Sequence, residues 1–358
     1  SALGIEGNGS YVGVFSKYEL TPAFQKKFFK GDVMKVTDDS NKRDSVYWES
    51  IRPIPLTAEE QVDYIRKDSI RVVKESRPYL DSLDRKNNKF KFANIISGYQ
   101  FEDRYTKTDY SISGLLESVQ FNTVEGLNIG VGTTFRKRFE DRRYVLTELS
   151  GRYGFAIGEV SGSGSVLYMY NNKKFGNVKL SGGSDLVQFN DAKPISPLIN
   201  TSYSLFGEKN YMKLYRKSFV TFEAGLEPVN GIRLAAGISY ALRDAVRNHS
   251  DFTFVDKDDR RYTSNNPLAP GIDLLMFPSN NALKAGVSAR FRIKQKYIDR
   301  PDVNYIIGSK YPALFVSYSK GISNVLESDV DYDRIELGLE DNVRLGMLGT
   351  LSYYGMYG

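Results

Sequence analysis

The fold is decided by two stretches: residues 283–294, Leu-Lys-Ala-Gly-Val-Ser-Ala-Arg-Phe-Arg-Ile-Lys, and residues 232–243, Ile-Arg-Leu-Ala-Ala-Gly-Ile-Ser-Tyr-Ala-Leu-Arg. In both, large apolar residues alternate with small or cationic ones, so one side of the chain is apolar and the other is polar. Soluble strands are usually ~5–6 residues long, whereas a tilted membrane-spanning strand needs ~9–11. Both runs continue for about a dozen residues. They therefore predict long, two-faced β-strands.

The same two-residue period recurs from Ser111 to Gly358, in about eleven or twelve candidate strands. Short turns are expected at residues 228–231 and 340–342, and a long polar connection at 244–281. Short turns on one side and long loops on the other are typical of transmembrane barrels, as are aromatic girdles at the strand ends. Aromatic residues lie near the ends of the runs at Tyr153, Phe155, Tyr240, Phe291, Tyr318 and Tyr353.

Alternating strands also build soluble sandwiches, in which one face is core and the other is wet. Here Gly, Ser and Ala lie opposite many of the apolar residues. Small residues fit an enclosed interior better than an open solvent face. We therefore predict an all-β fold, a transmembrane antiparallel β-barrel whose strands occupy residues 111–358. The last strands are expected to be missing at the C-terminal end, so that the chain covers only part of the barrel.

The region before the strands is expected to contain a β/loop segment at residues 1–56 and a helical linker at residues 57–110. Thr57 and Glu60 form a capping box, in which each side chain caps the backbone of the other. The helix is expected to run from about Ala58 to Glu75. Pro78 should end it, and a second short helix is expected at about residues 79–85.

Composition excludes several classes of function. The 358 residues include no Cys and one His, and the net charge is +6. Disulfides, thiolate catalysis and Cys-ligated metals are excluded, and a single His argues against a His-rich metal site or a Ser-His-Asp triad. The net charge is too modest to indicate nucleic acid. We expect no enzymatic activity, no cofactor, no metal site and no nucleic-acid partner.

Two sets of residues on the clearest strands are candidates for facing different environments. The apolar set is expected to face lipid: Ile232, Leu234, Ile238, Leu283, Val287, Phe291 and Ile293. The cationic set is expected to face the lumen: Arg233, Arg243, Lys284, Arg290, Arg292 and Lys294. These cations would either create an anion-favouring interior or pair with carboxylates in a plugged lumen, with Glu223, Glu227, Glu336 and Glu340 as partners.

The single tryptophan lies before the helical linker. Trp48 and Arg52, followed by Pro53 and Pro55, are candidates for docking this segment to a partner. The alternative is that Trp48 seals the helix against the rim of the barrel. The residues alone leave both interpretations open.

Several stretches, in the same order along the chain, resemble the DUF5686 family of Bacteroidota outer-membrane proteins, which often carry a preceding carboxypeptidase-regulatory-like domain. They are residues 41–60 (NKRDSVYWESIRPIPLTAEE), 118–126 (SVQFNTVEG), 210–215 (NYMKLY), 309–312 (SKYP) and 320–322 (KGI). The resemblance implies a β-barrel in the outer membrane of a Gram-negative bacterium, with the N-terminal part in the periplasm. It implies family members that are longer at both ends, and a distant similarity to Omp85-type barrels.

The resemblance implies no established activity. It implies outer-membrane lipid and lipopolysaccharide as partners, together with other envelope proteins. Three functional hypotheses follow: a structural or assembly/export component of the envelope, an outer-membrane channel that transports small or anionic solutes, and a soluble β-rich binding module.

Overall fold

The protein is built around one large antiparallel sheet. The computed structural model describes residues 13–15, 18–24, 32–40, 42–190, 193–272, 274 and 277–358. Thirteen strands form this sheet in the order β16-β15-β14-β11-β10-β9-β8-β7-β6-β5-β3-β2, with β4 pairing beside β3 on the same edge of β5. In the part of the chain that is described, β2 and β16 do not pair with each other, so the sheet is open.

Most strands of the large sheet are longer than soluble strands usually are. Its members are β2 (Tyr99–Asp103), β3 (Thr108–Ile112), β4 (Val119–Asn122), β5 (Gly126–Arg138), β6 (Tyr144–Gly154), β7 (Glu159–Asn171), β8 (Gly176–Gln188), β9 (Leu214–Val229), β10 (Ile232–Ala245), β11 (Asn280–Arg292), β14 (Ala313–Gly321), β15 (Tyr332–Arg344) and β16 (Thr350–Tyr357). A second sheet joins β1 (Asp32–Lys35), β12 (Lys296–Asp299) and β13 (Asn304–Gly308).

Helices lie mainly ahead of the sheet. They are α1 (Ser45–Ile51), α2 (Ala58–Glu75), α3 (Arg77–Asn87), α4 (Ala93–Ser97), α5 (Leu115–Ser118) and α6 (Pro197–Gly207), with a 3-10 turn at Gly346–Leu348. The predicted capping box is confirmed, because Glu60 N donates to Thr57 Oγ1 while Thr57 N donates to Glu60 Oε2. Among the described helices, none combines the length and the apolar character needed to cross a membrane.

The prediction of an all-β fold with long antiparallel strands is confirmed, with differences at three boundaries. The large sheet begins at Tyr99, inside the range expected for the helical linker. The turn expected at residues 340–342 is wrong, because these residues continue β15 and the chain turns at 345–349 instead. Asp341 and Asn342 pair with Tyr353 and Ser352 of β16, so their turn-forming tendency is overridden by the ladder. The run at 283–294 is displaced to Asn280–Arg292.

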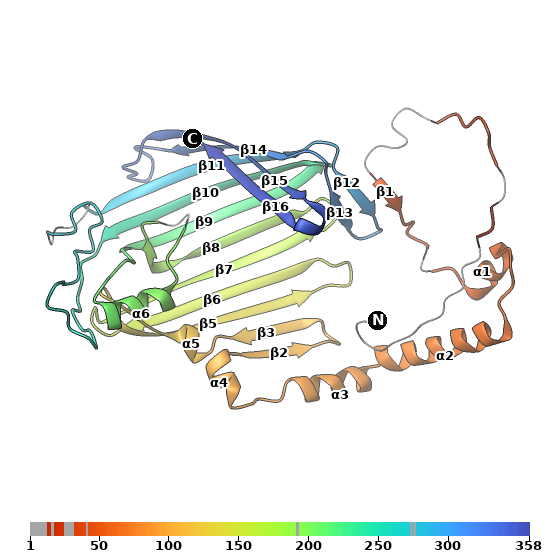
Figure 1. Ribbon diagram of the computed structural model, residues 1–358, viewed down its shortest axis with the longest axis horizontal. Coiled ribbons are helices and arrows are strands. Elements are labelled where there is room, and N and C mark those ends of the chain that lie inside the picture. The colour runs from red at the N-terminus through yellow and green to blue at the C-terminus, as the bar shows by residue number, and fades with distance from the viewer. Residues whose placement is uncertain are drawn as a thin grey trace.

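The N-terminal segment is described only in pieces. Of the β/loop segment expected at residues 1–56, residues 1–12, 16–17, 25–31 and 41 lie outside the described residues. In the remainder, β1 pairs in parallel with β12, which links this segment to the connection between β11 and β14. Figure 1 shows α2 and α3 beyond the same end of the sheet as β12 and β13.

The two ends of the sheet differ in their connections. At one end, called the turn end, short links join β5 to β6, β7 to β8 and β9 to β10. At the other, called the loop end, residues 189–213 link β8 to β9 and residues 246–279 link β10 to β11. The small hydrophobic core of Val124, Leu186, Met212 and Leu214 lies at the loop end.

The tight turn predicted between β9 and β10 is confirmed, and it depends on a glycine. Gly231 has a φ of +83°, and a Cβ at this position would lie 2.5 Å from the carbonyl oxygen of Arg292. Gly231→Ala is therefore expected to lower the free energy of unfolding by about 1–3 kcal/mol. Denaturant titration of the purified chain measures this change. Gly271→Ala is the control, because a Cβ added to Gly271 would meet no described atom within 4 Å, and equal stability of the two variants would contradict the explanation.

Candidate functional site

The register of the long strands separates two chemically different faces. Directly opposed residues of an antiparallel pair point to the same face. β10 and β11 pair Ile232 with Phe291 and Arg233 with Arg290, and this pairing continues along both strands. The predicted apolar residues on these strands therefore share one face, called the apolar face. The predicted cations on them share the other, called the polar face.

The apolar face is exposed over most of its extent. Val287 is 56% exposed and Ile238 is 48% exposed, while Leu283 is buried below the loop between β14 and β15. Ile293 lies in the turn that follows β11 and is exposed. Other large, exposed side chains continue this face across the neighbouring strands: Ile129, Val131, Leu149, Val166, Leu180, Val220, Phe222, Leu234, Leu314, Ile335, Leu337 and Leu339.

The predicted cations fall into separate groups. Arg233, Arg290 and Arg292 lie near the turn end of β10 and β11, and Lys294 lies in the turn after β11. Arg243 and Lys284 lie nearer the loop end. The six cations therefore do not form one continuous patch.

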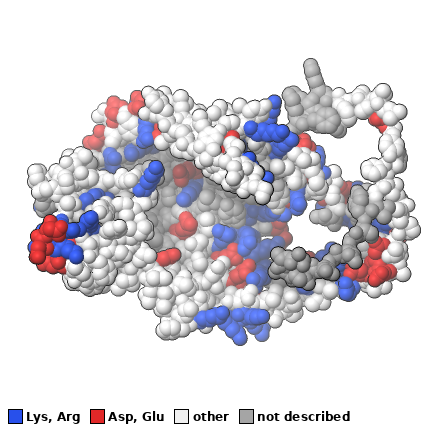
Figure 2. Space-filling model, viewed as in Figure 1, with Lys and Arg blue, Asp and Glu red and all other residues white. Residues whose placement is uncertain are grey.

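Several of the cations have partners in the fold. Arg290 pairs with Glu340 at 3.2 Å, as anticipated for a paired interior. Arg233 lies 5.9 Å from the centre of the Phe175 ring, and Lys294 donates to the hydroxyl of Tyr311 at 3.0 Å. Figure 2 shows side chains of both signs within the hollow of the molecule.

A buried polar network closes around the turn between β4 and β5. Asn122 Oδ1 accepts from Val124 N and Glu125 N, while Asn122 Nδ2 donates to Glu125 Oε2 at 2.7 Å. Glu125 is 2% exposed, and its Oε1 pairs with Arg152 Nε at 2.7 Å. Arg152 also contacts Asp185 at 2.6 Å. The turn is thus fixed to β6 and β8, because breaking this network would leave charges buried without partners.

The same turn is fixed to the long loop between β10 and β11. Thr123 Oγ1 donates to Asn248 Oδ1 at 2.7 Å. Asn210 Nδ2 donates to the carbonyl oxygen of Thr263 at 2.7 Å, and its Oδ1 accepts from Thr263 N. Asn265 Oδ1 accepts from Leu214 N at 3.0 Å. We call residues 119–126, 197–214 and 246–266 together the polar cap, because their amides and hydroxyls hydrogen-bond to one another at the loop end.

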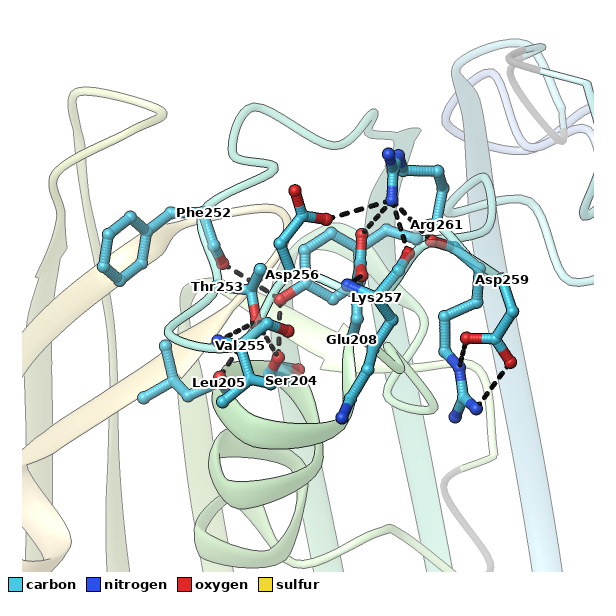
Figure 3. A network of polar contacts seen from close by, with 12 residues as sticks. Ser204, Leu205, Glu208, Phe252, Thr253, Val255, Asp256, Lys257, Asp259 and Arg261 are labelled. Atoms are coloured by element: carbon cyan, nitrogen blue, oxygen red, sulfur yellow. Dashed lines mark hydrogen bonds and ion pairs between the residues drawn. The ribbon is translucent and has the colours of Figure 1, made fainter.

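The end of α6 anchors the charged part of this loop. Glu208 adopts a left-handed conformation with a φ of +50°, and its buried carboxylate accepts from Lys257 N at 2.9 Å. Figure 3 shows Arg261 bonded to Asp256 and lying 3.5 Å from Glu208. Asp259 pairs with Arg260 beside them. These aspartates are thus engaged by arginines, and across the described residues no cluster of three metal-ligating side chains is found.

Trp48 and Arg52 lie apart from the sheet, in and just after α1. The Arg52 guanidinium lies 5.7 Å from the centre of the Tyr64 ring, which joins α1 to α2. Trp48 is 45% exposed and packs edge-on against Tyr47. His249 contributes its backbone, since its N–H donates to the carbonyl oxygen of Thr123.

Sequence reasoning missed the polar cap and the groove described next. Residues 118–126 and 210–215, which carried the family resemblance, meet in the cap. Asn122, Thr123 and Asn210 in these stretches were the available signal, because buried amides and hydroxyls must find partners. Which partners they find depends on contacts between residues far apart in the sequence, as between Phe121 and Thr201.

A groove runs along the polar face over β3 to β8. Its volume is about 1040 Å³, and a smaller cavity of about 210 Å³ adjoins it. Ser113, Glu117, Gly132 and Ser150 line both, so the two are continuous. The groove is larger than two apolar depressions of about 370 and 570 Å³ on the other face of the sheet.

The chain belongs to DUF5686, a family of unknown function: residues 93–358 match the model of its C-terminal domain. No curated protein and no solved structure is significantly similar to the chain. The family assignment expected from the resemblance is confirmed, and it brings no activity with it.

The polar cap can be opened by one substitution. Asn210→Ala removes four hydrogen bonds with Thr123 and Thr263, and each buried group left without a partner costs about 1–3 kcal/mol. Limited proteolysis is expected to cut residues 246–272 much faster in this variant. Asn172→Ala, at the turn end, is the matched control. Cleavage of the two variants at the same rate would show that Asn210 does not hold the loop.

Lys213 provides a pH-dependent probe of the same cap. Its ammonium donates to Thr263 Oγ1 and to the carbonyl oxygen of Ser264, both at 2.7 Å, and burial lowers the pKa of Lys213 from 10.5 to about 8. Between these values the unfolded chain binds more protons, so stability is expected to rise with pH from about 8 to about 10.5.

Competitive acetylation followed by mass spectrometry measures this pKa directly. The midpoint for Lys213 is expected near pH 8, well below the ordinary lysine value of 10.5. A Lys213→Met variant should lose the rise in stability with pH. A labelling midpoint above pH 10 would contradict the burial of this ammonium.

Proposed function

We propose that this member of the DUF5686 family forms the wall of a transmembrane β-barrel in the outer membrane of a Gram-negative bacterium. The continuous apolar face carries the proposal. Contiguous exposed apolar surface of this extent is unusual on soluble monomers, and it argues against the soluble binding module. Hydrocarbon is the environment that matches it.

The strand lengths fit the same environment. β10 has 14 residues and β9 has 16. At ~3.3 Å per residue and a tilt of ~45°, a strand of this length spans about 33 Å. The hydrocarbon core of a bilayer is about 30 Å thick, so one such strand is sufficient to cross it.

Within the envelope, a structural or assembly/export role is the function that the geometry supports best. Buried hydrogen bonds of the polar cap hold the loops at the loop end in place, which favours a scaffold over an open pore. Predicted lumen cations are dispersed, and Arg290 is neutralised by Glu340. These contacts disfavour the anion channel. We propose no enzymatic activity, and propose outer-membrane lipid, lipopolysaccharide and other envelope proteins as partners.

The orientation follows from the connections. Short turns face the periplasm in transmembrane β-barrels, which supports a periplasmic location for the turn end. α1, α2 and α3 would then project into the periplasm, where Trp48 and Arg52 are accessible to a protein partner. The polar cap would face the cell exterior.

Neighbouring residues on opposite faces test the membrane proposal. In a Trp48→Phe background, Val287→Trp places the only tryptophan on the apolar face, and Ser288→Trp places it on the polar face. In reconstituted vesicles, brominated acyl chains are expected to quench the fluorescence of Val287→Trp several-fold more than that of Ser288→Trp. Equal quenching would refute the lipid-facing assignment.

Conductance separates the scaffold from the channel. In planar bilayers the reconstituted chain is expected to be electrically silent, because the polar cap closes the loop end. Asn210→Ala, which loosens the cap, is expected to show openings that the Asn172→Ala control lacks. A steady anion-selective current through the unmodified protein would favour the transport hypothesis instead.

A further inference from the structure

The polar face carries a regular row of polar groups, four hydroxyls and one carboxylate. Register pairs Ser111 with Thr134, Thr134 with Glu148, Glu148 with Ser165 and Ser165 with Ser181 on successive strands from β3 to β8. All five residues line the groove. Because neighbouring strands lie ~4.7–4.9 Å apart, the row presents a hydrogen-bonding group at that interval along the groove.

The row is polar without being strongly charged. The charged residues that line the groove are Lys89, Glu102, Glu117, Glu148 and Lys179, a difference of one negative charge. A polyanion would need a surplus of cations here, and a polycation would need a denser set of carboxylates. The near balance favours an uncharged ligand.

The adjoining cavity holds a hydrogen-bond donor that the fold leaves unused. Asn128 is 1% exposed and lines this cavity, and its Nδ2 has no hydrogen-bond partner among the described residues. A buried amide without a partner costs about 1–3 kcal/mol, so an acceptor oxygen in the cavity would relieve that cost. Ser150 and Ser161 lie in the same cavity, with hydroxyls able to donate or accept.

We propose that this continuous groove binds a neutral oligosaccharide. Sugar hydroxyls donate and accept in the same way as the Ser and Thr hydroxyls of the row. Carboxylates such as that of Glu148 accept further hydrogen bonds from the sugar. Asn128 Nδ2 donates to a ring, hydroxyl or acetamido oxygen of the sugar. Phe219 and Tyr99 also line the groove and add aromatic carbon to its surface, against which the C–H groups of a sugar can pack. The inference concerns the polar face alone and does not depend on whether the apolar face lies in lipid.

A polypeptide fits the groove less well. An extended peptide that binds a sheet does so at an edge, through its main-chain groups. The groove instead lies over the face of β3 to β8, where main-chain groups are already paired within the ladder. Side-chain hydroxyls are what this surface offers.

Binding to the full chain in detergent tests the proposal. The probes are maltohexaose, the N-acetylglucosamine hexamer, and a neutral Ala-Ser hexapeptide as the polypeptide arm. Saturation-transfer NMR and calorimetry are expected to show saturable binding of at least one hexasaccharide and none of the peptide. Tighter binding of the N-acetylglucosamine hexamer than of maltohexaose would indicate that Asn128 Nδ2 donates to an acetamido oxygen.

Matched variants locate the binding site. Ser165→Trp fills the groove and is expected to weaken sugar binding at least tenfold, while Val166→Trp, on the opposite face of the same strand, leaves it unchanged. Asn128→Leu, which removes the unused donor, is expected to weaken binding about threefold to tenfold. If Ser165→Trp does not fold, Ser150→Leu serves in its place.

The outcomes are distinct from those of the membrane test. The proposal is overturned if neither hexasaccharide shows saturable binding. It is also overturned if sugar binding survives Ser165→Trp or Ser150→Leu, or if the peptide binds in preference to both sugars. Lipid quenching of Val287→Trp is measured separately, so either proposal can fail while the other stands.

Discussion

The rest of the structure depends on the coupling between a two-residue side-chain period and an antiparallel register that holds over nearly the whole length of each long strand pair. A shift of one residue in any pairing would move that strand's apolar side chains to the other face. Opposed pairs such as Ala236 with Val287 and Gly237 with Gly286 keep the two chemistries apart. The apolar face, the groove and the placement of the cations all follow from this register.

Glycine and serine determine how the polar face can be used. Gly130, Gly132 and Gly183 lie on the polar face of strands that form the groove or its flanks, and a Cβ on Gly130 or Gly183 would approach neighbouring atoms to within 3.0 Å. Small residues let the strands approach and curve, and leave space that large side chains would fill. The hollow is therefore produced by the small residues of the polar face, just as the exposed apolar surface is produced by the large residues of the apolar face.

Periodicity predicted the long strands, their two faces and the tight turn at Gly231, because those features depend on neighbours in sequence. The capping box of α2 was predictable for the same reason. Asp341 and Asn342 show where local reasoning fails, since the ladder with β16 overrides their tendency to turn. α6 was also missed: it is short, and its Asn200 and Thr201 bond to Phe121, almost 80 residues away. Other bonds of the polar cap, such as those of Asn210 with Thr123 and Thr263, also join residues far apart in the sequence.

The edges of the sheet constrain the membrane proposal most sharply. At β2, the side chain of Asn88 both accepts from Glu102 N and donates to Glu102 O, and Asp84 accepts from Arg104 N. α3 and the residue after it thereby satisfy outward backbone groups that a free edge would expose. Across the residues that the structure describes, β16 pairs with β15 alone. Hydrocarbon offers no partner for backbone groups, so residence in a bilayer requires that the outward edge of β16 be paired there, by β-structure supplied from beyond the strands described.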